Sequence, residues 1–185
     1  MGKRYQAIPE KLIDFIQQQK LFFVATATED SQVNLAPKGM DSLRVIDANR
    51  VIWLNVTGSG NETATHVQHS PRMTLMFCAF EGAPMILRLY GKAQVIHQGD
   101  DQWQQLYPHF TPLSGARQIF DLEIDLVQSS CGMSVPFFDY VGEREQLSDW
   151  AAKKDESGIR EFWRDRNQLS IDGKQSLILE KSGIK

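Results

Sequence analysis

The sequence contains little cysteine: Cys78 and Cys131 are its two cysteines in 185 residues. Two cysteines so far apart cannot build a disulfide framework or supply most ligands of a structural zinc site. The four histidines form neither a His-Glu-x-x-His pattern nor a cluster with cysteine, so the sequence predicts no metal site. Cys78 lies within an apolar run, which favours a buried side chain with no chemical role.

Charge of one sign is also scarce. The formal net charge is −3, and no run of lysine and arginine forms a basic stripe. This distribution lacks the electrostatic footprint of a nucleic-acid or anionic-membrane partner. The longest apolar runs, 21–25 and 75–80, are much shorter than the about 20 residues of a membrane-spanning helix, and the N-terminal residues lack the apolar centre of a signal peptide. A cytoplasmic location is therefore expected.

What is present is a sizeable apolar fraction, 42%, which suits one domain over residues 1–185. After Pro9, the residues Leu12, Ile13 and Ile16 share one side of a segment, which predicts a helix. Local patterns predict strands at 21–28, 32–36, 43–46, 50–56, 72–80, 85–96 and 118–127, helices at 61–69 and 100–110, and a helical extension over about 143–185.

The order of these segments predicts the fold class. One hairpin follows another, and only one short helix separates consecutive strands in the middle of the chain. Apolar and polar residues alternate along 85–96 and 118–127, so each of these strands has one core face and one polar face. An antiparallel sheet that closes or nearly closes on itself fits this pattern. We therefore predict a mainly β protein, a small β-barrel with peripheral helices.

Residues 53–66 run from a strand through a glycine turn into a helix start, which is typical of an anion site. Gly58 and Gly60 are expected to allow backbone angles that a Cβ would forbid. Ser59 or Asn61 would cap the helix over 61–69, whose first amides would favour a phosphate. The alternative is an ordinary capped helix after a turn.

Two other glycine-loop sites are less consistent with these residues. Gly58-Ser59-Gly60 invites comparison with the dinucleotide fingerprint, because Glu81 lies about 20 residues further on, where a ribose-binding acid is expected. However, Thr63 occupies the third glycine position, the following helix is short, and no further strand–helix–strand units follow. The phosphate loop of nucleotide hydrolases requires Gly-Lys-Ser or Gly-Lys-Thr, which the sequence lacks here.

Five short motifs follow one another along the first half of the chain. They are Pro37-Lys38-Gly39, Leu43-Arg44-Val45-Ile46-Asp47, Gly60-Asn61-Glu62-Thr63, Ser70-Pro71-Arg72 through Met76-Phe77, and Leu87-Arg88-Leu89-Tyr90-Gly91. In order and spacing they resemble the pyridoxamine 5′-phosphate oxidase-like flavoproteins. The resemblance covers about residues 15–97 and implies a split β-barrel that dimerises and holds FMN in a cleft between two subunits.

Carried over by residue, the resemblance places Arg44 at the family's phosphate-binding arginine and Thr57 beside the flavin. Asn61 and Thr63 fall where the family has a Ser-Arg-Lys run that contacts the phosphate. That departure removes two charge-assisted contacts. The positive charge would then come from Lys38 and Arg88, which belong to matching motifs, and Ser59 completes the expected cofactor-binding set.

Each of these residues also has a structural interpretation. Arg88 could pair with Asp121, Glu123 or Asp125 across strands. Arg44 and Lys38 could be solvated strand residues, and Ser59 and Thr63 could act only as helix caps.

The C-terminal part departs further from the oxidase. Residues 129–136 and 140–144 instead resemble a bacterial subgroup of unknown substrate, so vitamin B6 oxidation is not implied. Ser134 lies in a Gly-x-Ser-x-Pro run that lacks the second glycine of a nucleophile elbow, and we interpret it as a loop. The function predicted is an FMN-dependent oxidoreductase, a homodimer acting on an unidentified small molecule. The alternative is a flavin- or haem-binding module without turnover, and no catalytic acid or base is predicted.

Overall fold

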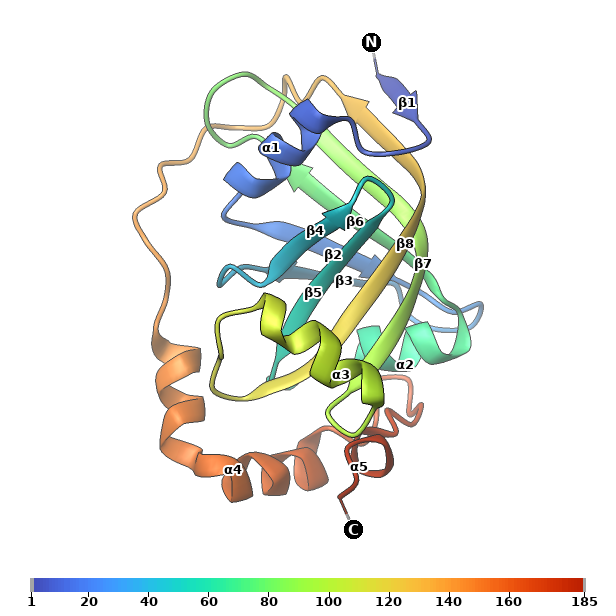
Figure 1. The fold of residues 1–185 in the computed structure, drawn as a ribbon, viewed down its shortest axis with the longest axis vertical. Coiled ribbons are helices and arrows are strands. Elements are labelled where there is room, and N and C mark those ends of the chain that lie inside the picture. Colours follow the sequence, from blue (N-terminus) through green and yellow to red (C-terminus); the bar gives the residue numbers. More distant parts are fainter. Residues whose placement is uncertain (1, 185) are drawn as a thin grey trace.

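An antiparallel sheet forms most of the molecule in the computed structural model, which describes residues 2–184 (Figure 1). Its strand order is β3-β2-β6-β7-β8-β5-β4, and β1 pairs with β8 off this path. The end strands β3 and β4 are not paired with each other, so the barrel is split, as predicted. The strands are β1 (Lys3–Tyr5), β2 (Phe22–Thr26), β3 (Asn34–Lys38), β4 (Leu43–Asp47), β5 (Arg50–Val56), β6 (Arg72–Cys78), β7 (Ile86–His97) and β8 (Ala116–Ser130).

Helices lie at the two ends of this sheet (Figure 1). They are α1 (Glu10–Gln18), α2 (Glu62–His69), α3 (Asp101–Leu106) with the short 3₁₀ helix η1 (Tyr107–His109), α4 (Gln146–Arg166) and α5 (Ile178–Lys181). The predicted helix at 100–110 is therefore two shorter pieces, and the strand predicted at 118–127 is longer at both ends. Strand β1 was not predicted; it pairs with the end of β8.

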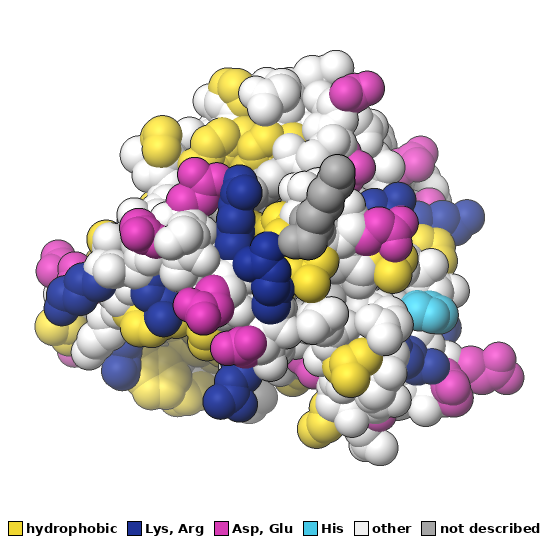
Figure 2. Space-filling view, turned by 90° about the horizontal axis from the view of Figure 1, so that it is seen from below, with side chains coloured by type: hydrophobic (Ala, Val, Ile, Leu, Met, Phe, Trp, Pro, Cys, Tyr) yellow, Lys and Arg dark blue, Asp and Glu magenta, His cyan; other side chains and the backbone are white. Residues whose placement is uncertain are grey.

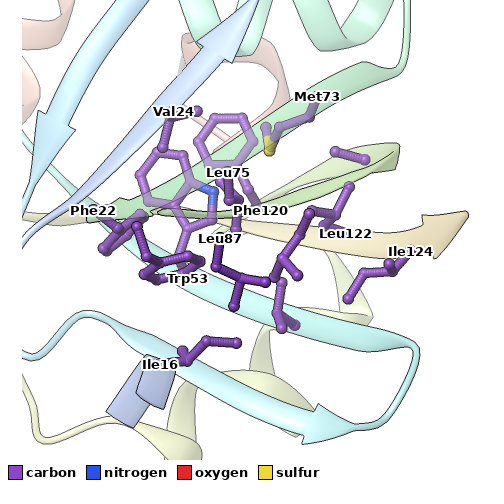
Figure 3. Close-up of a cluster of buried hydrophobic side chains, with 14 of the residues drawn as sticks. Ile16, Phe22, Val24, Trp53, Met73, Leu75, Leu87, Phe120, Leu122 and Ile124 are labelled. Carbon is purple, nitrogen blue, oxygen red and sulfur yellow. The ribbon is translucent and has the colours of Figure 1, made fainter. Parts of the chain in front are cut away.

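The barrel interior is filled by apolar side chains that alternate along the strands (Figure 3). The rings of Trp53 and Phe120 stack with their centroids 4.4 Å apart, and Phe22 stacks on Phe77 at 5.9 Å. Ile16 and its neighbour Leu12, one helical turn away, bury the inner face of α1 against this core.

The outer face of the same strands carries a second apolar cluster. Ile52, Leu54 and Ile119 are buried there, covered by the side chains of Trp103 and Phe110 from α3 and the residues after it. Because both faces of β5 are covered, consecutive residues of this strand are buried, which is typical of a central strand.

The bend in the two longest strands requires a glycine. The register between β7 and β8 shifts at Tyr90 and Gly91. A Cβ on Gly91 would lie 1.9 Å from the carbonyl oxygen of Glu123, so no other residue fits without moving the backbone.

The C-terminal extension leaves the barrel after β8. Residues 131–145 contain no helix or strand, and in Figure 1 they run along one side of the sheet towards α4. Helix α4 is kinked at Asp155, where φ is 53°. Trp163, Ile159 and Ile178 are buried in a third apolar cluster, which anchors the extension below the barrel. Figure 2 shows basic and acidic side chains interspersed on this end of the molecule.

Candidate functional site

The 58–63 turn joins β5 to α2. The backbone amide of Thr57 donates to the carbonyl oxygen of Gly115 at 2.7 Å, which fixes the start of the turn. Helix α2 begins with Asn61 as its N-cap residue, whose side chain makes no capping hydrogen bond, while the backbone amide of Asn61 donates to the Glu62 carboxylate at 3.0 Å. The prediction that Ser59 or Asn61 caps this helix is therefore wrong. The exposed Ser59 side chain lies at the surface of the turn.

The two glycines of this turn do not play the predicted role. Neither Gly58 nor Gly60 has a positive φ, and a Cβ on Gly58 would meet no atom within 4 Å. A Cβ on Gly60 would approach only a side-chain oxygen of Glu62, at 3.2 Å. The backbone therefore adopts angles open to other residues, and the turn is shaped by hydrogen bonds instead.

Arg117 supplies two of those bonds, and no local pattern in the sequence indicates this role. Only 4% of this residue is exposed. Its guanidinium donates to the carbonyl oxygen of Gly60 at 2.8 Å and to that of Gly58 at 3.2 Å, while its Nε has no partner. Burial lowers the pKa of Arg117 to about 10, an effect that the charge of Glu62 opposes. A register shift between β5 and β8, at Asn55 and Val56, lies opposite this point.

Lys38 lies near the same buried charges. It pairs with Phe22 across β2 and β3, and its Nζ lies 5.2 Å from the centroid of the Trp53 ring. Burial lowers the pKa of Lys38 to about 8, helped by the positive charge of Arg117 and opposed by Glu62. The indole nitrogen of Trp53 is buried without a partner. The half-buried Lys38 and the buried Arg117 therefore share one nearby carboxylate, that of Glu62.

The C-terminal extension docks on this turn. The indole nitrogen of Trp163 donates to the hydroxyl of Thr57 at 2.9 Å, and the amide of Asn167 donates to the carbonyl oxygen of Gly58 at 2.9 Å. The amide of Asn61 donates to the carbonyl oxygens of Arg166 and Leu169. The side chains of Thr57 and Asn61 are thus engaged by the chain itself.

Thr63 is engaged in a separate buried network. Its hydroxyl accepts a hydrogen bond from the amide of Asn34 at 3.0 Å. The same amide bonds the hydroxyl of Thr26, which lies 3.1 Å from Nδ1 of His66. This network links α2 to β2 and β3 through the barrel interior.

Arg44 lies at a different place, on β4 near η1. Its guanidinium makes an ion pair with Asp41 at 2.9 Å, donates to the carbonyl oxygen of His109, and lies over the ring of Phe110. It is therefore not a solvated strand residue. The same residue lines a pocket between α1 and β4.

Arg88 is separate again. Its guanidinium donates to the hydroxyl of Ser130 at 3.3 Å. The suggested pairing with Asp121 is wrong, because Arg50 holds that carboxylate in a two-bond contact at 2.8 and 2.9 Å. The exposed Arg50 guanidinium is close enough to do so because its strand, β5, neighbours β8.

Pairing along strand β8 shows how far the 58–63 turn lies from Arg88. The 58–63 turn follows Val56, which pairs with Ala116, whereas Arg88 pairs with Gln128. Twelve residues of strand extend over about 40 Å. Arg44 lies on β4, which β5 and β8 separate from β7. One chain therefore does not bring Arg44, Arg88 and the turn together into a single site.

A family model for pyridoxamine 5′-phosphate oxidase matches residues 8–131, more than half of the chain. The chain belongs to the pyridoxamine 5′-phosphate oxidase family. The matched region includes the split barrel from α1 to the end of β8, and the C-terminal extension lies outside it.

Similar proteins agree with this assignment. The pyridoxamine 5′-phosphate oxidase family protein ustO of Aspergillus flavus is 35% identical over 146 residues, which cover 76% of this chain and 59% of the fungal protein. The chain therefore spans less than two thirds of that relative's length. Two solved structures share the fold at 18% identity, and each covers 66% of this chain: HupZ from Group A Streptococcus, with a TM-score of 0.53 and 99% of its own length, and a candidate pyridoxamine 5′-phosphate oxidase from Lactobacillus delbrueckii, with 0.52 and 94%.

Residues 2–184 also bear on metal binding and on membrane insertion. No group of three or more His, Cys, Asp and Glu side chains there is placed to hold a metal ion. Across the same residues, no helix combines the length and the apolar character needed to cross a bilayer. Ser134 lies in a turn closed by the Val135 amide on the Gly132 carbonyl oxygen, which agrees with its interpretation as a loop residue.

Proposed function

We propose that the chain is an FMN-binding flavoprotein that acts as an oxidoreductase on a small molecule, and that it functions as a homodimer. Family membership supports flavin binding in general. The single observation that carries the proposal to FMN is the surplus of positive charge at the 58–63 turn, where the half-buried Lys38 and the buried Arg117 have one carboxylate, Glu62, to balance them. A phosphate group would compensate this charge.

The positive charges and amide groups near the turn suit a phosphate group. Lys38 and Arg117 would hold it together with the first amides of α2, which no side chain caps, and with the exposed Ser59. The Nε of Arg117, which has no partner in the structure, would be a hydrogen-bond donor to the phosphate. The side chains of Thr57, Asn61 and Thr63 are engaged within the chain, so their part in binding stays a prediction.

When bound, the flavin ring supplies the hydride or electron transfer. The protein's own contribution is then to hold the phosphate by charge and to exclude water with the extension that covers the turn. A second subunit would contribute the more distant Arg88, which one chain cannot bring to Arg44 and the turn. This is the structural support for the dimer.

The test is a comparison of FMN with riboflavin, measured by flavin fluorescence on the purified protein. We expect FMN to bind at least about tenfold more tightly, because hydrogen bonds to a charged group contribute about 1.5–3 kcal/mol each. Lys38→Met should narrow this difference, whereas Lys92→Met, which removes an exposed lysine of β7, should not. Equal affinities for the two flavins would exclude the turn as a phosphate site.

The visible spectrum and light scattering complete the test. A protein that purifies with the intense absorption band of haem and binds no FMN would favour the haem-binding alternative. A monomer that retains its flavin in solution would contradict the dimer.

A further inference from the structure

A pocket of about 190 Å³ lies between the end of α1 and β4, separate from the 58–63 turn. Its apolar lining includes Phe22, Phe77, Leu43 and Val45. Phe22 and Phe77 stack on each other at an interplanar angle of 28°. Ile16 of α1 also lines the pocket, and Figure 3 shows Ile16 and Phe22 among the buried side chains of the barrel core. Phe22 and Phe77 are 5% and 1% exposed, so a small part of each ring forms the base of the pocket.

The mouth of the pocket is polar and held in a strained conformation. Met40 and Asp41 have φ values of 64° and 50°, in the left-handed region that non-glycine residues avoid. Asp41 accepts two hydrogen bonds from the guanidinium of Arg44 at 2.9 Å, which fixes this edge. Such strain persists where the surrounding contacts hold it, and it concentrates at ligand sites.

Among the charged residues that line the pocket, one cation has no carboxylate to balance it. Asp41 and Arg44 line the pocket and neutralise each other. Lys20 also lines the pocket, and its Nζ lies over the ring of Tyr140 at 5.7 Å from the centroid. The nearby carboxylate of Glu143, in the segment that crosses this side, accepts a hydrogen bond from the Tyr140 hydroxyl. The charge of Lys20 is thus the one that the lining residues leave unbalanced.

Size limits the ligand to one ring. An apolar cavity of about 150 Å³ holds benzene, so a volume of this order holds one six-membered ring with a small substituent. The three fused rings of a flavin exceed it. The pocket therefore fits a substrate and not the cofactor.

We propose that this pocket binds a single aromatic ring that carries one carboxylate, with the ring against Phe22 and Phe77 and the carboxylate towards Lys20. The statement that such a compound is the substrate of the oxidoreductase rests on the proposed function. Binding of the compound to the pocket requires no flavin.

The experiment is a titration of the full chain, followed by NMR, with benzoate, benzamide and benzylamine, which share a ring and differ in charge. We expect benzoate to saturate with a dissociation constant of about 1 mM or tighter and to shift the resonances of Phe22 and Phe77. Benzamide should bind about fivefold more weakly, the size of one exposed ion pair, and benzylamine more weakly still.

Two variants and a control sharpen this result. Lys20→Gln should reduce benzoate affinity to that of benzamide and leave benzamide unchanged, whereas Lys11→Gln, an exposed lysine elsewhere on α1, should change neither. Val45→Phe should fill the pocket and abolish binding of all three compounds. Because Lys20 is exposed, its variant tests the proposal even if Val45→Phe does not fold.

Three outcomes would overturn the proposal: no saturable binding of benzoate, equal binding of benzoate by Lys20→Gln and the unmodified protein, or shifts confined to residues away from the pocket. The FMN titration separates the two proposals. If the protein binds benzoate but not FMN, the pocket proposal is supported and the flavoenzyme proposal is contradicted. If it binds FMN but not benzoate, the pocket proposal alone is contradicted.

Discussion

At the 58–63 turn, the protein's own extension takes up the polar groups of the α2 start, whereas at the pocket between α1 and β4 the polar groups surround open space. Trp163 and Asn167 reach the turn from α4 and the residue after it, and both donate hydrogen bonds within it. Within residues 2–184, no residue of α4 or after it lines the pocket, and the extension reaches only its mouth, where Lys20 faces the ring of Tyr140.

This difference separates stability from binding. Buried polar groups are stable only when they find partners, so the bonds at the turn hold the extension to the barrel. Polar groups at the edge of an apolar pocket remain available to orient a ligand. Variants that remove a buried bonding partner at the turn should therefore lower folding stability strongly, and the loss of a polar side chain at the pocket should change it little.

The largest effect is expected from Trp163→Ala. This side chain is 1% exposed, and its replacement should lower the free energy of unfolding by about 3–5 kcal/mol, because it leaves a large cavity between extension and barrel. Urea unfolding measures the change. Trp150→Ala, at a partly exposed tryptophan of the same helix, should cost clearly less. Similar losses for the two variants would show that the docking of Trp163 on the turn is not special.

Lys38 should make stability depend on pH. The pKa of Lys38 in the folded protein is about 8, below the ordinary lysine value of 10.5, so the unfolded chain binds more protons between these two pH values. The free energy of unfolding should therefore rise as pH increases from 8 to 10.5, by at most about 3 kcal/mol. Urea unfolding across this range measures it.

The matched variants isolate this contribution. Lys38→Met should flatten the rise between these pH values, whereas Lys92→Met should preserve it. The same rise in Lys38→Met and the unmodified chain would contradict the burial of this amine beside Arg117.

The barrel could be predicted because its signals are local. Alternation along 85–96 and turn residues between strands indicate each hairpin without knowledge of the rest of the fold. Arg117 could not be found in this way. It precedes the alternating pattern that begins at residue 118, and its partner Gly58 is 59 positions away.

The docking of the extension was equally hidden. The amphipathic pattern indicated helices in this region, but not where their faces would pack. Asn61 looked like a helix cap because such residues usually bond their own backbone. In the structure its amide instead bonds the carbonyl oxygen of Leu169, 108 positions away. Long-range contacts of this kind have no local sequence pattern.

A smaller effect is expected at the strained mouth of the pocket. Met40→Gly should raise the free energy of unfolding by about 0.5–1 kcal/mol, because relief of left-handed strain, about 1–2 kcal/mol, exceeds the entropic cost of glycine. Thermal unfolding followed by circular dichroism measures it. Asp41→Gly relieves similar strain but loses the ion pair with Arg44, so its gain should be smaller. A loss of stability in Met40→Gly would mean that the Met40 side chain contributes more than its backbone costs.

The smallest effect is expected from the opposite substitution at the turn. Gly58→Ala should raise the free energy of unfolding by about 0.4–1 kcal/mol, because its φ is not positive, a Cβ there meets no atom within 4 Å, and alanine reduces the entropy of the unfolded chain. Gly60→Ala should gain less, since its Cβ would approach Glu62. If Gly58→Ala also leaves FMN affinity unchanged, the turn holds its ligand by the charges of Lys38 and Arg117. A large loss of FMN affinity without a loss of stability would instead mean that the ligand approaches the Gly58 backbone closely, as glycine turns at phosphate sites allow.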